Sequence, residues 1–167
     1  MTLPAEIRVA WRRIPGGVER RTVSRALLAE LLPGASFAAR CVRCGGEHGR
    51  LRVSGADAAV SVSYAEGWAF AVTVSGAMSV GLDAVPVAVT GLERVLPGAD
   101  AGVWARVEAV LKADGRGLAV DPARVRFAAA SPGADWNARI DDGPALTGWD
   151  VTGPPGVVVA VTLPPRG

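Results

Sequence analysis

The sequence predicts an α+β fold, because segments with the alternating apolar pattern of strands occur on both sides of segments with helical spacing. Half of its 167 residues are apolar, which is enough to bury one sizeable core or two small cores packed together. No low-complexity tract or flexible linker interrupts the pattern. We therefore expect one compact body.

A strand followed by a helix is expected near the N-terminus. Apolar and polar residues alternate over residues 7–11, which is the period of a half-buried strand. Residues 18–34 have helical spacing, because Val23, Leu27 and Leu31 lie on one face, and a Pro-Gly pair ends the segment. The sequence thus changes from strand to helix within its first 35 residues.

The middle of the chain contains the clearest hairpin signal. Residues 58–76 form two alternating runs joined by a turn at residues 66–67, which are Glu-Gly. A short strand is expected over residues 78–85. A helix should follow over residues 104–113 and end at the Asp-Gly pair at 114–115.

The last third of the chain returns to strand patterns. Residues 125–130 and 135–141 each resemble a strand, and residues 148–164 resemble a hairpin. The apolar strand after the turn near residue 70 looks like the one near residue 160. This internal similarity is a weak indication of two related halves.

Positive charge is concentrated in the first third of the sequence. Residues 1–52 hold ten arginines against four acids, and the remaining residues hold eight basic side chains against twelve acids. This basic third either faces an anionic ligand or forms a solvated face. Nucleic-acid binding fits less well, because these arginines are interleaved with apolar residues instead of forming a polar run.

A cluster of cysteine and histidine offers a second hypothesis, a zinc site. Cys41, Cys44 and His48 have suitable spacing, but a structural zinc site needs four ligands, so an acid such as Glu47 would have to supply the last. Two cysteines so close together are too few for a disulfide framework and are typical of a reducing compartment.

We expect a cytoplasmic monomer that does not associate with membranes. No apolar run reaches the length of about 18 residues that a spanning helix requires. The first residues also lack the apolar segment and cleavage site of a secretory signal.

Three ionisable residues stand out as candidates for chemistry. Lys112 is the only lysine among 18 basic residues, which is expected where a compact ammonium is needed instead of a guanidinium. Glu108 precedes it by four residues on the predicted helix, and this spacing is also that of a common surface ion pair. Asp83 lies where an apolar strand ends, and two carboxylates with substrate phosphates are a usual way to hold Mg²⁺.

The segments around these residues resemble the 4'-phosphopantetheinyl transferase superfamily, in particular its surfactin-synthetase-activating type. SVGLDAV is similar to the family's G-(I/V)-D-x-E motif, and WARVEAVLKADGRGL is similar to its W-x-x-K-E-(A/S)-x-x-K-x-x-G-x-G motif. Further matches follow in the family's order: RTVSRALLAELL, CVRCGGEHGRL, VSVSYAEGWAFAVTV and GVVVAVTL. Each motif is weak alone, but together they span nearly the whole chain.

The resemblance implies a fold of two similar α/β halves related by a pseudo-twofold axis, with coenzyme A between them. We place the N-terminal half at residues 1–85 and the C-terminal half at residues 86–167. The implied activity is the Mg²⁺-dependent transfer of phosphopantetheine from coenzyme A to a serine of an acyl or peptidyl carrier protein.

The resemblance also assigns roles to residues. Asp83 and Glu108 would bind Mg²⁺, and Glu108 would also accept the proton of the serine hydroxyl. Lys112 would contact phosphate and protonate the leaving group.

Further residues would bind coenzyme A by the same resemblance. Arg50 occupies the basic position of the family's G-(R/K)-P motif. Ser63 and Tyr64 occupy the two positions where the family has a serine-histidine pair. Either Arg21 or Arg25 would reach the 3'-phosphate.

Several positions differ from the family's motifs. Val85 replaces the second acid, Val107 replaces the first lysine, and Tyr64 replaces a histidine. The segment from Asp83 to Glu108 is also shorter, at 25 residues. A catalytically silent homologue that binds coenzyme A is therefore the alternative hypothesis.

Overall fold

The computed structural model describes residues 3–39, 44–46 and 49–165. These residues form an α+β fold with two α-helices and several antiparallel sheets. The helices are α1 (Arg20–Leu31) and α2 (Ala101–Asp114), and short 3₁₀ helices span Leu92–Arg94, Gly117–Ala119 and Pro122–Arg124. The strands are β1 (Ile7–Arg13), β2 (Ser36–Ala38), β3 (Arg52–Ser54), β4 (Ala58–Ala65), β5 (Trp68–Ser75), β6 (Gly81–Pro86), β7 (Val125–Ala128), β8 (Trp136–Ile140), β9 (Leu146–Val151) and β10 (Val157–Leu163).

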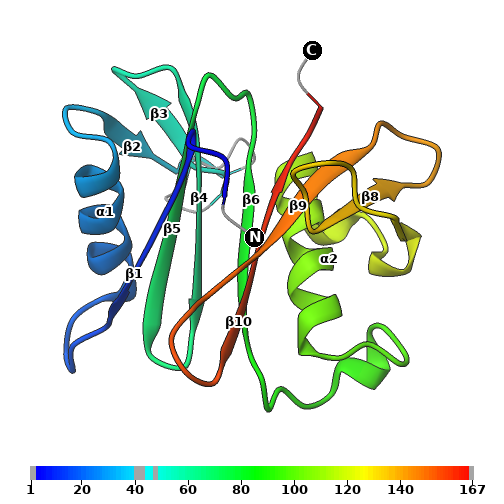
Figure 1. Cartoon of the computed structure of the whole chain (residues 1–167). Coiled ribbons are helices and arrows are strands. Elements are labelled where there is room, and N and C mark those ends of the chain that lie inside the picture. Colours follow the sequence, from blue (N-terminus) through cyan, green and yellow to red (C-terminus); the bar gives the residue numbers. More distant parts are fainter. Residues whose placement is uncertain (1–2, 40–43, 47–48, 166–167) are drawn as a thin grey trace.

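The strands form two main sheets and one small one. The first sheet has the order β1-β5-β4, the second has the order β6-β10-β9-β8-β7, and β2 pairs with β3 alone. Every pairing is antiparallel. Figure 1 shows the two main sheets between the helices, with α1 beside the first sheet and α2 beside the second.

The alternation of side chains along each strand produces the layers. On β5, Ala69 and Ala71 pack against α1, while Phe70 and Val72 point to the opposite face and pack against the second sheet. The far face of the second sheet packs against α2. The described residues thus form one apolar cluster under each helix and a third between the sheets.

Strand β6 is the element that positions the candidate site. Leu82 and Ala84 face the first sheet, whereas Val85 packs into the cluster beneath α2. Gly81 and Asp83 share the α2 face with Val85, because side chains alternate along a strand. A Cβ on Gly81 would lie 1.8 Å from the carbonyl oxygen of Ala109, so α2 can approach β6 this closely only at a glycine.

The two main sheets meet at β4 and β6 through side chains. The hydroxyl of Ser61 accepts a hydrogen bond from the backbone N–H of Leu82 at 3.2 Å. The hydroxyl of Ser63 accepts a hydrogen bond from the backbone N–H of Ala84, also at 3.2 Å. Two alternate serines on one strand therefore satisfy alternate backbone donors on the next, in place of a regular backbone ladder.

Most of the expected elements are confirmed, but Asp83, which was expected where an apolar strand ends, lies in the middle of β6. The hairpin has its turn at residues 66–67, where Glu66 and Gly67 have φ values of 48° and 71°. Helix α2 ends at Gly115, whose φ of 90° is the left-handed conformation expected of a C-terminal glycine. The pairing of β2 with β3 was not predicted, since each strand has only three residues. Within the described ranges, neither α-helix is long and apolar enough to cross a membrane.

Candidate functional site

Asp83 and Lys112 form the centre of the site. Lys112 donates a hydrogen bond from Nζ to Oδ1 of Asp83 at 2.7 Å, and the hydroxyl of Ser63 donates to the same oxygen at 2.8 Å. The side chain of Asp83 is only 10% exposed, and that of Lys112 is 31% exposed. The fold therefore joins β4, β6 and α2 at a single carboxylate oxygen.

The ammonium of Lys112 also ties the two sheets together. It donates to the carbonyl oxygen of Leu82 on β6 at 2.9 Å and reaches that of Val62 on β4 at 3.5 Å. With Asp83, these are three acceptors for the three N–H groups of an ammonium. Lys112 thus fills the junction between β4 and β6 instead of pairing with Glu108 along the helix.

Glu108 is half-buried and has no hydrogen bond or ion pair with any residue that the structure describes. Burial raises the pKa of its carboxyl above the ordinary value, and the nearby negative charge of Asp83 raises the pKa further. The ammonium of Lys112 lowers the same pKa, but with a smaller effect. Two carboxylates therefore lie close enough to interact, and among the described residues only Asp83 has a cation in contact.

A pocket of about 250 Å³ lies beside Lys112, between β4 and the C-terminal end of α2. The residues that line it come from both parts of the chain, and they include Arg50, Leu51, Ser61, Leu111, Lys112 and Gly115. Among its described lining residues, Arg50 and Lys112 are positively charged and give it the charge that an anionic group would require. Apolar side chains form much of the remaining wall.

Arg50 is held at the end of α2 by a chain of hydrogen bonds. Its guanidinium donates to the hydroxyl of Ser79, which in turn donates to the carbonyl of Ala113. A Cβ on Gly115 would lie 2.6 Å from Nη1 of Arg50, so the glycine that ends α2 also makes room for the arginine. The C-terminus of a helix carries partial negative charge, which favours a cation there.

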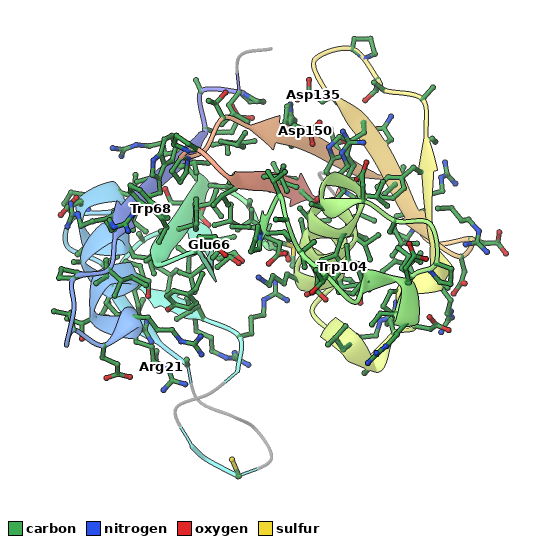
Figure 2. All side chains as sticks on the ribbon, turned by 90° about the horizontal axis from the view of Figure 1, so that it is seen from below. Arg21, Glu66, Trp68, Trp104, Asp135 and Asp150 are labelled. Carbon is green, nitrogen blue, oxygen red and sulfur yellow. The ribbon has the colours of Figure 1, made fainter. Side chains whose placement is uncertain are left out.

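The other predicted ligands lie on α1 or next to it. The hydroxyl of Tyr64 is 2.7 Å from that of Ser24, and the guanidinium of Arg20 lies 4.9 Å from the centre of the tyrosine ring. Arg25 is half-buried, and its Nη1 is buried without a hydrogen-bond partner in the described chain. Figure 2 shows Arg21 on the α1 side of the molecule and Trp104 on the α2 side.

The structure brings some of the predicted residues together and leaves others apart. Asp83, Ser63 and Lys112 are in contact, and Arg50 shares the pocket with Lys112. Arg21 is exposed on α1. No distance ties it or Arg25 to this pocket, so their assignment to coenzyme A stays a prediction, as does that of Tyr64.

The two positions that depart from the motifs on β6 and α2 hold core side chains. Val85 is 4% exposed and Val107 is 1% exposed, and both belong to the apolar cluster beneath α2. A carboxylate or an ammonium at either position would be buried among apolar groups. Of the residues named in the zinc hypothesis, Cys41, Glu47 and His48 lie outside the described residues and Cys44 is exposed, so the zinc site stays a prediction.

The donor set is compatible with one hard cation that also binds phosphate. Across residues 3–39, 44–46 and 49–165, no three His, Cys, Asp or Glu side chains gather into a metal-binding group. Mg²⁺ is usually held by only one or two carboxylates plus substrate phosphates. Both hydrogen bonds to Asp83 fall on Oδ1, so Oδ2 has no partner in the described part of the chain, and neither has the carboxylate of Glu108.

Two residues at the site were missed by sequence reasoning. Ser61 lines the pocket and binds β6, and Ser79 links Arg50 to α2. The alternation of Ser61 with Ser63 in an otherwise apolar strand was a usable signal, because polar side chains on a buried strand face need partners. Ser79 gave no such signal.

Comparison with known proteins adds no assignment, since neither a protein-family model nor a curated protein matches the chain.

Proposed function

We propose that the protein transfers 4'-phosphopantetheine from coenzyme A to a serine of an acyl or peptidyl carrier protein in the presence of Mg²⁺. The observation that supports this most is the grouping of Asp83, Glu108 and Lys112 beside a positively charged pocket. This grouping joins two distant segments of the sequence, β6 and α2. It provides the carboxylates and the ammonium that transfer from a diphosphate requires.

The arrangement of layers is compatible with two related halves, each with a helix on the outer face of a sheet. Under this proposal the halves are residues 1–85 and 86–167, related by a pseudo-twofold axis. Strand β6 spans the proposed boundary and pairs with β10 of the second sheet. The diphosphate of coenzyme A would then occupy the pocket between β4 and α2.

In the proposed reaction, the serine hydroxyl of the carrier attacks the phosphorus atom that bears the pantetheine. A new P–O bond forms to the serine, and the bond within the diphosphate breaks to release 3',5'-ADP. The carboxylate of Glu108 accepts the serine proton, and its raised pKa brings it closer to that of a useful general base near neutral pH. Lys112 donates a proton to the departing phosphate.

The other residues bind and orient the substrate. Arg50 neutralises a phosphate from its place at the end of α2. Ser63 keeps the carboxylate of Asp83 in one orientation through its hydrogen bond. Mg²⁺ bound by Asp83 and Glu108 would stabilise the negative charge that develops on the phosphate oxygens.

The test is a mass measurement on the carrier. The purified protein is incubated with coenzyme A, Mg²⁺ and a panel of apo carrier proteins, and the intact mass of each carrier is read. One phosphopantetheine group should be added to at least one carrier, and Glu108→Gln and Asp83→Asn should abolish the addition. Absence of any addition, or unchanged addition by both variants, would contradict the proposal.

A catalytically silent protein that binds coenzyme A is the second candidate. It is favoured by the apolar side chains of Val85 and Val107, which remove two charges that the family's motifs contain. This candidate predicts that coenzyme A raises the melting temperature of the protein while no carrier gains mass.

A further inference from the structure

The contact between Lys112 and Asp83 has a consequence for cation binding. Asp83 is the more buried of the two carboxylates at the site, and its charge is balanced by the ammonium of Lys112 at 2.7 Å. Removing a buried carboxylate from such a partner costs free energy, which a competing cation would have to supply. The pair therefore opposes binding of a second cation at the same group.

Charge counting at the site leads to the same result. Asp83, Glu108 and Lys112 together carry a net charge of −1 when both acids are ionised. Without Lys112 the net charge would be −2. A divalent cation is attracted more strongly by two uncompensated carboxylates than by one, and at a partly buried site this difference is not fully screened.

We propose that Lys112 is the resident cation of this site, and that a divalent cation binds well only together with a phosphate-bearing ligand that draws Lys112 away from Asp83. This inference rests on the proposed function, because the ligand is the diphosphate of coenzyme A. The metal then binds weakly to the protein alone and more tightly once coenzyme A is bound.

The surroundings of Lys112 make such a movement feasible. Its ammonium lines the 250 Å³ pocket, so a phosphate bound there lies within reach of a flexible four-carbon side chain. All three of its N–H groups already have acceptors, so a new bond to phosphate must replace one of them. If phosphate replaced only the longest contact, the one of 3.5 Å to Val62, Asp83 would stay paired and the proposal would be wrong.

The first experiment measures metal binding without coenzyme A. Mn²⁺ is titrated into the free protein and unbound Mn²⁺ is read by electron paramagnetic resonance. Lys112→Met and Lys112→Gln should each bind Mn²⁺ roughly tenfold more tightly than the native chain, because one positive charge has been removed beside both carboxylates. Arg94→Met removes the same charge from an exposed position and should leave the affinity unchanged.

Two outcomes would overturn the inference. One is equal affinity of the native protein and both Lys112 variants, with folding verified by circular dichroism. The other is an equal gain for Arg94→Met, which would indicate a general effect of net charge. Neither outcome depends on carrier modification, so the inference and the proposed function can fail separately.

The second experiment adds coenzyme A. The native protein should bind Mn²⁺ at least tenfold more tightly with saturating coenzyme A than without it, after correction for Mn²⁺ bound by free coenzyme A. In Lys112→Gln this gain should be several-fold smaller, since the carboxylates are already free. A gain of the same size in both proteins would contradict the displacement of Lys112 from Asp83.

Discussion

Lys112 contacts Asp83 on a different element and does not pair with Glu108, its neighbour four residues earlier on α2. The ammonium lies 2.7 Å from Oδ1 of Asp83 and 2.9 Å from the carbonyl oxygen of Leu82. A helix that merely carried a surface ion pair would leave this ammonium in solvent. Here the side chain crosses to β6 and joins the two sheets, which has consequences for stability as well as for chemistry.

Lys112→Met should destabilise the fold. It leaves the carboxylate of Asp83, which is 10% exposed, without a cation. We expect the free energy of unfolding to fall by about 2 kcal/mol, and the loss is limited to this size because Lys112 itself is partly exposed. Asp83→Asn should cost less, since Ser63 can still donate to the amide oxygen. Urea unfolding of both single variants and the double variant measures the coupling. Purely additive losses would show that the pair contributes nothing.

Glu108→Gln should stabilise the protein at neutral pH. The pKa of Glu108 is raised above its ordinary 4.5, so the folded chain binds more protons than the unfolded chain between 4.5 and the raised value. Stability from this group is therefore present at low pH and is lost as pH rises through the raised pKa. The variant should melt at a higher temperature than the native protein at pH 7, and the difference should disappear near pH 4.

The matched control for this prediction is Glu19→Gln, which changes an exposed glutamate at the start of α1. It should show no comparable gain at pH 7. If both variants gain equally, the effect belongs to net charge and not to the burial of Glu108.

Gly81→Ala should be severely destabilising. The added Cβ would lie 1.8 Å from the carbonyl oxygen of Ala109 and 2.7 Å from the backbone nitrogen of Ala113, so α2 must move off β6. We expect a loss of about 3 kcal/mol or more in the free energy of unfolding. Gly16→Ala is the control, because a Cβ there meets nothing within 4 Å. Similar denaturation midpoints for the two variants would contradict the close packing of α2 on β6.

Arg50→Met should weaken coenzyme A binding without large loss of stability. Arg50 is exposed, lines the pocket and is directed there by Ser79, so its removal takes away a charged contact with phosphate. A loss of about tenfold in affinity is expected by calorimetry, as for one charge-assisted hydrogen bond. Arg52→Met, on β3, removes an exposed charge two residues away and should have little effect. Equal losses would mean that no specific contact is made by Arg50.

Local patterns in the sequence were sufficient to predict most of the elements. The turn at Gly67 and the end of α2 at Gly115 follow from the left-handed backbone conformation that glycine adopts readily, whereas the φ of 48° at Glu66 is uncommon for a non-glycine residue. The apolar faces of both helices follow from spacing, since Leu27 and Leu111 are almost fully buried.

The candidates Asp83, Glu108 and Lys112 could also be selected from residue type and motif.

The partners of those candidates were decided only by the tertiary structure. The sequence placed Glu108 and Lys112 on one helical face, but the close approach of α2 to Gly81 brings Lys112 to Asp83 instead. The serine bonds between β4 and β6 likewise depend on how two sheets meet. Helical and strand periods report only near neighbours along the chain, whereas the pairing of buried charges depends on which elements pack together and how closely.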